Sequence, residues 1–200
     1  NVHQINAATY GTDDDAFIMV HGAAIDHLSD DELRFVIGHE CGHIQNNHVV
    51  YLTTLYRLLQ IASAASAGLL TPFLQPLVLA LQGWSRAAEI TCDRAGLLCC
   101  RDPDVAVTAF AKLAIGSRKL FDEMNLDEFI SQMHEDHSAL GRMVELNKSH
   151  PHLTRRIAAL KVFAESAMYR ESVGLAGGYG REELEKRTLD AVKVPERPAP

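Results

Sequence analysis

Basic clusters are scarce in this sequence of 200 residues. Its 19 lysines and arginines are outnumbered by 26 acidic residues, which gives a net charge of −7. No stretch concentrates Lys and Arg into a basic stripe. Because a protein needs such a stripe to neutralise a phosphate backbone, we expect no nucleic-acid partner.

Cysteine pairs at metal-binding or redox spacing are also missing. The chain has four cysteines and no CxxC motif, and its two adjacent cysteines would form only a strained disulfide. We therefore expect buried, reduced thiols, which favours a reducing compartment. The four are Cys41, Cys92, Cys99 and Cys100.

Charge is absent from the whole stretch between Leu58 and Ser85. Such a length raises the question of a membrane span, but Pro72 and Pro76 divide it and several Gln and Ser residues dilute it. We predict that residues 58–85 form a buried or interfacial helical hairpin, or a segment that covers a cleft. A spanning helix is the less favoured alternative, and a peripheral membrane contact through this segment stays open.

The remaining pattern predicts an α+β fold that is predominantly helical. Residues 4–9 and 16–21 are apolar or β-branched and flank the turn-forming GTDDD, so they predict a small antiparallel sheet near the N-terminus. Ser29 and Glu32 have the spacing of a capping box, which predicts a helix from there to about residue 59, with a break. Further helices are predicted over about 83–100, 103–116, 126–147 and 151–174.

The length and the hydrophobic content of 47% predict one compact domain, over residues 1–174. Residues 175–200 are rich in Gly, then in charge, then in Pro, and we expect a flexible extension around a short helix. Because the sequence begins at Asn1 and not at Met, we expect it to be a piece of a longer chain.

The motif HECGH places His39 and His43 one helical turn apart, with Glu40 between them. Residues at i and i+4 share one face of a helix, so both imidazoles can reach a single ion. Catalytic zinc takes a third protein ligand, and the best candidate is Glu89, which is itself four residues before Asp93. One of these carboxylates could bind the ion while the other accepts a hydrogen bond from a ligating histidine.

Three linked motifs resemble one family. HECGH, then EITCD at 89–93, then HPHLTRRI at 150–157 are similar to the gluzincin metallopeptidases of the CaaX prenyl protease and HtpX type, in order over roughly residues 4–160. The resemblance implies a zincin-like domain with its small sheet packed on the HExxH helix. It also implies one zinc ion, with these roles: ligands His39, His43 and Glu89; general base Glu40; supporting carboxylate Asp93; His150 and Arg156 near the active site, holding it or stabilising the oxyanion; and Asn6, Ala7 and Ala8 in a strand that binds substrate.

The sequence therefore predicts a zinc-dependent endopeptidase in which Glu40 assists a zinc-bound water. Strand addition reads mainly backbone, so we expect unfolded or misfolded polypeptides as substrates and a role in protein quality control. The alternatives are a latent enzyme covered by residues 58–85, or a zinc-stabilised chaperone-like or docking module without turnover. A cytoplasmic or membrane-associated location is favoured, with a periplasmic one as an alternative.

The other histidines predict less. His48 lies five residues after His43 and is expected to be an exposed helix residue. His134 and His137 have a spacing of three with no third partner nearby in sequence, which favours a solvated helix face.

Overall fold

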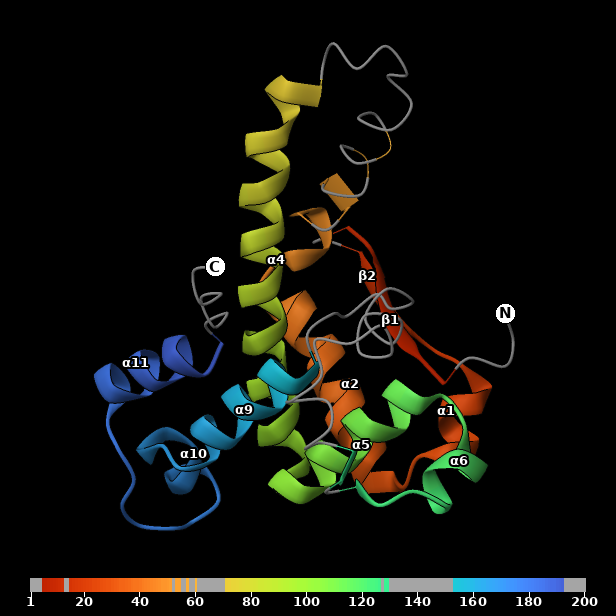
Figure 1. Ribbon diagram of the computed structural model, residues 1–200, viewed down its shortest axis with the longest axis vertical. Coiled ribbons are helices and arrows are strands. Elements are labelled where there is room, and N and C mark those ends of the chain that lie inside the picture. Colours follow the sequence, from red (N-terminus) through yellow and green to blue (C-terminus); the bar gives the residue numbers. More distant parts are fainter. Residues whose placement is uncertain are drawn as a thin grey trace, which may run out of the picture.

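The computed structural model describes residues 5–12, 15–51, 53–54, 57, 60, 71–126, 128–129 and 153–192. Within them, the chain is mostly helical with one small antiparallel sheet, as predicted (Figure 1). The elements are β1 (Ala7–Gly11), β2 (Ala16–Val20), α1 (Gly22–His27), α2 (Asp30–Gln45), α4 (Thr71–Cys100), α5 (Pro103–Ile115), α6 (Arg118–Asp122), α9 (Leu153–Ala164), α10 (Ala167–Ser172) and α11 (Arg181–Val192). Most of the predicted helix over 126–147 lies outside the described residues.

Helix α2 begins at the predicted capping box. The backbone N–H of Glu32 donates to Oγ of Ser29 at 3.3 Å, and the backbone N–H of Ser29 donates to Oε2 of Glu32 at 2.7 Å. The same carboxylate accepts from Nζ of Lys112 on α5 at 2.9 Å, and Glu32 is buried. The Glu32 carboxylate of the capping box therefore also links α2 to α5.

The break expected in the helical stretch from Ser29 to about residue 59 lies directly after α2. Gln45 is its last residue, and a turn at Asn46 and Asn47 follows before the chain becomes helical again at His48. Asn47 has a φ of 55°, a left-handed conformation that asparagine tolerates better than most residues. The turn changes the direction in which the next residues point.

Helix α4 is longer than predicted. It begins at Thr71, not near Gly83, and runs through Pro76 to Cys100. Pro72 lies in the first turn, where an amide has no helical acceptor. Pro76 lies inside the helix, where it removes the bond to the carbonyl of Pro72 and its ring crowds that carbonyl, yet the helix continues through it. The two prolines therefore do not divide this half of the uncharged stretch. No helix in the described part of the chain is long and apolar enough to cross a membrane.

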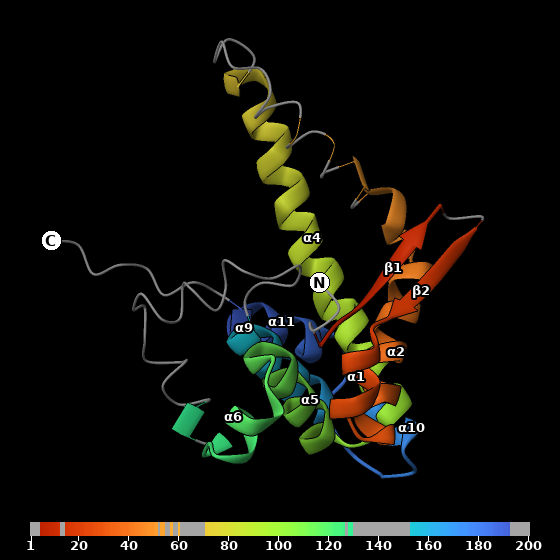
Figure 2. The ribbon, with the colours of Figure 1, turned by 90° about the vertical axis from the view of Figure 1, so that its right-hand side faces the viewer.

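Helices α2 and α4 pack side by side and carry the site (Figures 1 and 2). A Cβ atom at Gly38 would lie 2.7 Å from Sγ of Cys99, and one at Gly42 would lie 3.0 Å from Cα of Cys92. Both glycines therefore permit a close approach of α4 to α2. This explains their presence in a helix interior, where each costs about 1 kcal/mol relative to alanine.

The core lies where α2, α4, α5 and α9 meet. The rings of Phe35 and Phe110 pack edge to face, with centroids 5.0 Å apart, and Leu97, Leu160 and Phe163 complete the centre of the cluster. The sheet lies beside α2, with Ala7 paired to Val20 and Thr9 to Ile18 in antiparallel register. The sheet is thus packed on the HExxH helix, as the resemblance implied.

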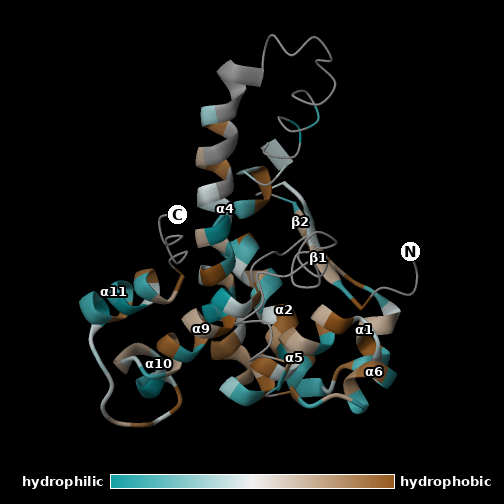
Figure 3. Cartoon of the chain, viewed as in Figure 1, coloured by the Kyte–Doolittle hydropathy of each residue, from teal (hydrophilic) through white to brown (hydrophobic). Residues whose placement is uncertain are grey.

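The C-terminal part differs from the expectation in one respect. The predicted helix over 151–174 is two helices, because the side chain of the buried Ser166 caps α10 by accepting from the backbone N–H of Tyr169 at 3.3 Å. Helix α11 consists mostly of hydrophilic residues (Figure 3), but its Leu184 is buried in the core. The short helix expected within residues 175–200 is thus α11, and it packs on the core.

Candidate metal centre

Side chains from α2 and α4 meet in a buried cluster. Nε2 of His39 lies 3.2 Å from Nε2 of His43. Glu89 reaches both rings: its Oε2 lies 3.6 Å from Nε2 of His39, and its Oε1 lies 3.5 Å from Nε2 of His43. All three side chains are buried. The structure thus brings together the three residues that the sequence predicted as metal ligands.

These separations suit a single zinc ion. Nitrogen and oxygen ligands bind zinc at about 2.0–2.2 Å in tetrahedral directions, so two ligand atoms should lie about 3.3–3.6 Å apart. Two imidazoles and one carboxylate also form a donor set that leaves the fourth position open, as in catalytic sites. The residues present therefore fit the ion.

The charge of the cluster favours a cation as well. Three carboxylates, those of Glu40, Glu89 and Asp93, are buried here with one guanidinium, that of Arg156. Three negative groups against one positive group give a formal charge of −2. A divalent cation would balance it, which matters because unpaired buried charge is strongly unfavourable.

Asp93 and Arg156 support the ligands from behind. Oδ1 of Asp93 accepts from Nδ1 of His39 at 2.9 Å, which leaves Nε2 of His39 for the ion. Arg156, from α9, donates to both oxygens of Asp93 at 2.7 and 2.5 Å, and its Nη1 lies 3.0 Å from Oε2 of Glu89. Burial alone would raise the pKa of Asp93, but the charge and hydrogen bonds of Arg156 outweigh it and hold that pKa below its usual range. The contacts of Arg156 are therefore those of a group that holds the site.

Glu40 has a partner that the sequence did not point to. Its Oε2 accepts from the hydroxyl of Thr9 at 2.6 Å, and the same hydroxyl lies 3.2 Å from the backbone oxygen of Glu40. Thr9 lies on β1, the strand that was expected to bind substrate. Ala7 and Ala8 belong to β1 and Asn6 directly precedes it. The only sequence signal for Thr9 was its alternation with Ala7, which puts both side chains on one face of the strand.

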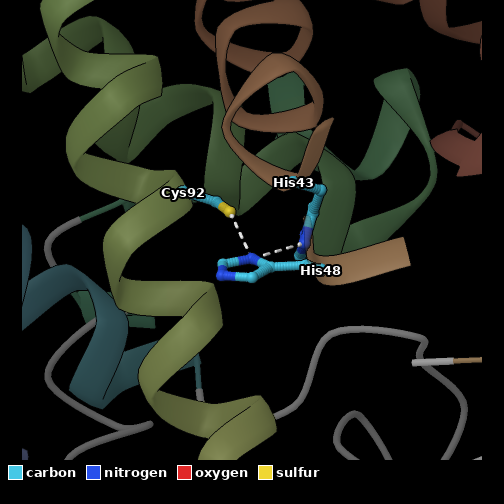
Figure 4. A group of neighbouring side chains, drawn as sticks. All are labelled: His43, His48 and Cys92. Atoms are coloured by element: carbon cyan, nitrogen blue, oxygen red, sulfur yellow. Dashed lines mark hydrogen bonds between the residues drawn. The ribbon is translucent and has the colours of Figure 1, made fainter. Parts of the chain in front are cut away.

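The expectation that His48 is exposed is wrong. Its side chain is only 7% exposed, because the turn at Asn46 and Asn47 directs it back toward α2 and α4. Its Nδ1 lies 3.3 Å from Nδ1 of His43 and 3.5 Å from Sγ of Cys92 (Figure 4). Burial lowers the pKa of His48 and raises that of the Cys92 thiol, so both groups favour their neutral forms.

His150, His134 and His137 lie outside the described residues.

The model of peptidase family M48 matches residues 1–164. The chain belongs to peptidase family M48. This confirms the resemblance to a zinc metallopeptidase family. The chain is also 38% identical, over 116 residues, to the plastoglobule-localized metallopeptidase 48, chloroplastic, of Arabidopsis thaliana.

The match to this M48 relative covers 58% of the chain and 33% of the relative, so the chain spans about a third of the curated protein's length. No solved structure matches the chain. Membership of the family and the metallopeptidase relative both support a metallopeptidase.

Proposed function

We propose that the protein is a zinc-dependent endopeptidase of the gluzincin type. The observation that carries this proposal is the buried group of His39, His43 and Glu89: the two Nε2 atoms lie 3.2 Å apart, and each lies 3.5 or 3.6 Å from one oxygen of the Glu89 carboxylate. Zinc bound there would supply a water of lowered pKa and would polarise the substrate carbonyl. The residues of the chain supply the rest of the chemistry.

Glu40 is the general base of the proposed reaction. It adjoins a ligand in sequence, is buried, and is held by the hydroxyl of Thr9. In the proposed mechanism Glu40 accepts a proton from the attacking water and later passes it to the leaving amine, which breaks the C–N bond. Thr9 restricts the carboxylate to one orientation, and Asp93 keeps the proton of His39 on Nδ1.

The substrate would lie extended along β1. Within the described residues β1 pairs with β2 alone, and its Thr9 contacts the proposed base. A polypeptide added to the other edge of β1 would bring its backbone near the metal centre by main-chain pairing, which selects weakly among side chains. This supports unfolded or misfolded polypeptides as the substrate class and a role in quality control.

The test is zinc content together with cleavage of unfolded casein. We expect stoichiometric zinc in the wild type and in Glu40→Gln, with cleavage lost only in that variant. Glu171→Gln, at an exposed position on α10, is the matched control and should cleave like the wild type. Zinc in both proteins with equal cleavage would refute Glu40 as the base.

The same assay separates the two alternatives. A docking module without turnover would bind zinc and cleave nothing, even after removal of residues 58–70. A latent enzyme would gain cleavage from that deletion. Of residues 58–70, only Gln60 is among the described residues.

A further inference from the structure

The two ring nitrogens of His43 have different surroundings. Its Nε2 faces His39 and Glu89, whereas its Nδ1 lies 3.3 Å from Nδ1 of His48 (Figure 4). A neutral imidazole that binds an ion through Nε2 carries its proton on Nδ1, and a buried N–H needs an acceptor. His48 can act as that acceptor only in the tautomer whose proton is on its own Nε2.

His48 is held in this position by helix α4. Sγ of Cys92 lies 3.5 Å from Nδ1 of His48, and the ring of Trp84 stands edge-on to it, with centroids 5.0 Å apart and an angle of 86°. Cys92 is fully buried and His48 nearly so. Packing on two sides fixes the ring and keeps its nitrogen beside His43, as a supporting residue of a metal site requires.

We propose that His48 is a positioning residue of the metal centre: its Nδ1 accepts the Nδ1–H of His43 and so holds Nε2 of His43 toward the ion. This inference rests on the proposed zinc function. His48 does for His43 what Asp93 does for His39, but with a neutral acceptor in place of a charged one. His43 is thereby oriented without adding a further negative charge to the cluster.

The same side chains also resemble a second ion site. His43, His48 and Cys92 each offer a donor atom, and these atoms lie within 4.8 Å of one another. An ion there would bind Nδ1 of His43. His43 could then hold the catalytic ion through Nε2 only as an imidazolate, after losing both ring protons. The hydrogen-bonded arrangement needs no such loss, and thiolate ligation is instead an outcome of the test.

Two variants separate positioning from packing. His48→Asn keeps an acceptor near the place of Nδ1 but loses the contact with Trp84, whereas His48→Leu keeps bulk beside Trp84 but loses the acceptor. The readout is the zinc dissociation constant, measured by competition with a chelator. We expect His48→Leu to bind zinc about 10- to 100-fold more weakly, the usual effect of losing such a partner, and His48→Asn to stay close to the wild type.

Equal zinc affinity of His48→Leu and the wild type, or equal weakening in both variants, would overturn the inference. A wild-type protein that binds no zinc would refute the proposed function itself, and the inference with it.

A second measurement needs no variant. Nitrogen-15 spectra of the zinc-loaded wild type should show the proton of His43 on Nδ1 and that of His48 on Nε2. A proton on Nδ1 of His48 would overturn the proposal, because that nitrogen could not accept. In the cobalt-loaded protein we expect no thiolate-to-metal absorption band; a band that disappears in Cys92→Ser would make Cys92 a ligand and overturn it as well.

Discussion

Arg156→Met is the substitution that most directly tests how the site is held together. The guanidinium of Arg156 contacts Asp93 through two hydrogen bonds and Glu89 through one ion pair, and it stacks 4.8 Å from the ring of Phe110. Methionine retains most of the apolar stem and the contact with Phe110. The variant therefore removes charge and hydrogen bonds while the packing largely stays.

The loss of stability expected for Arg156→Met comes from the two buried carboxylates that Arg156 contacts. Asp93 and Glu89 are 1% and 5% exposed, so both carboxylates lose their counter-charge without gaining water. Removal of one partner from a buried ion pair costs about 3–5 kcal/mol. Since a domain has about 5–15 kcal/mol in total, the metal-free variant should lose a large part of its stability. Zinc would return positive charge to Glu89, so the loaded variant should lose less.

Urea unfolding measures the stability that Arg156→Met loses in the metal-free protein and in the zinc-loaded protein. The double variant Arg156→Met with Asp93→Leu should be less destabilised than Arg156→Met alone, because one orphaned charge is gone. Arg155→Met, at the half-buried neighbouring position on α9, is the control, with an expected change within about 0.5 kcal/mol. If metal-free Arg156→Met lost no more stability than Arg155→Met, the reasoning about this buried network would be refuted.

Three further predictions concern helix packing, the base and pH. Gly42→Ala places a methyl group 3.0 Å from the backbone of Cys92, so it should push α4 away and lower both stability and zinc affinity, whereas Gly22→Ala meets nothing within 4 Å and should change neither. Thr9→Val should lower kcat by about 10- to 100-fold with little change in KM, because a hydrogen bond to a charged group is worth about 1.5–3 kcal/mol. Thr9→Ser keeps the hydroxyl and should retain most of the activity. Equal rates in the two variants would contradict a role of Thr9 in holding Glu40. Burial raises the pKa of Tyr169 in the folded protein above that of the unfolded chain. As pH rises through the usual tyrosine range, the unfolded chain therefore ionises before the folded one, and the stability that Tyr169 contributes at lower pH is lost. In urea titrations at pH 8 and above, Tyr169→Phe should lose less stability with rising pH than the wild type. An identical loss in both proteins would rule out Tyr169 as its source.

Local signals in the sequence determined the elements that carry the site. The capping box at Ser29 and Glu32 begins α2, and the spacing of His39 and His43 places both rings on one face of it. Asp102 and Pro103 begin α5, and Gly116 ends it in a left-handed conformation with φ of 67°. Each of these signals acts within a few residues, so a sequence suffices to find it.

Only the tertiary structure decided which helices meet and how. The approach of α4 to α2 at Gly38 and Gly42 brings Glu89 to within 3.6 Å of the histidine rings, although it lies far from them in sequence. A single left-handed residue, Asn47, reverses the expected exposure of His48, since periodicity assumes an unbroken helix. Thr9 reaches Glu40 because the sheet packs on α2. The sequence determined the chemistry that each segment carries. Helix packing and one turn decided which of those groups meet in one buried cluster, because contacts between distant segments depend on how whole elements fit together.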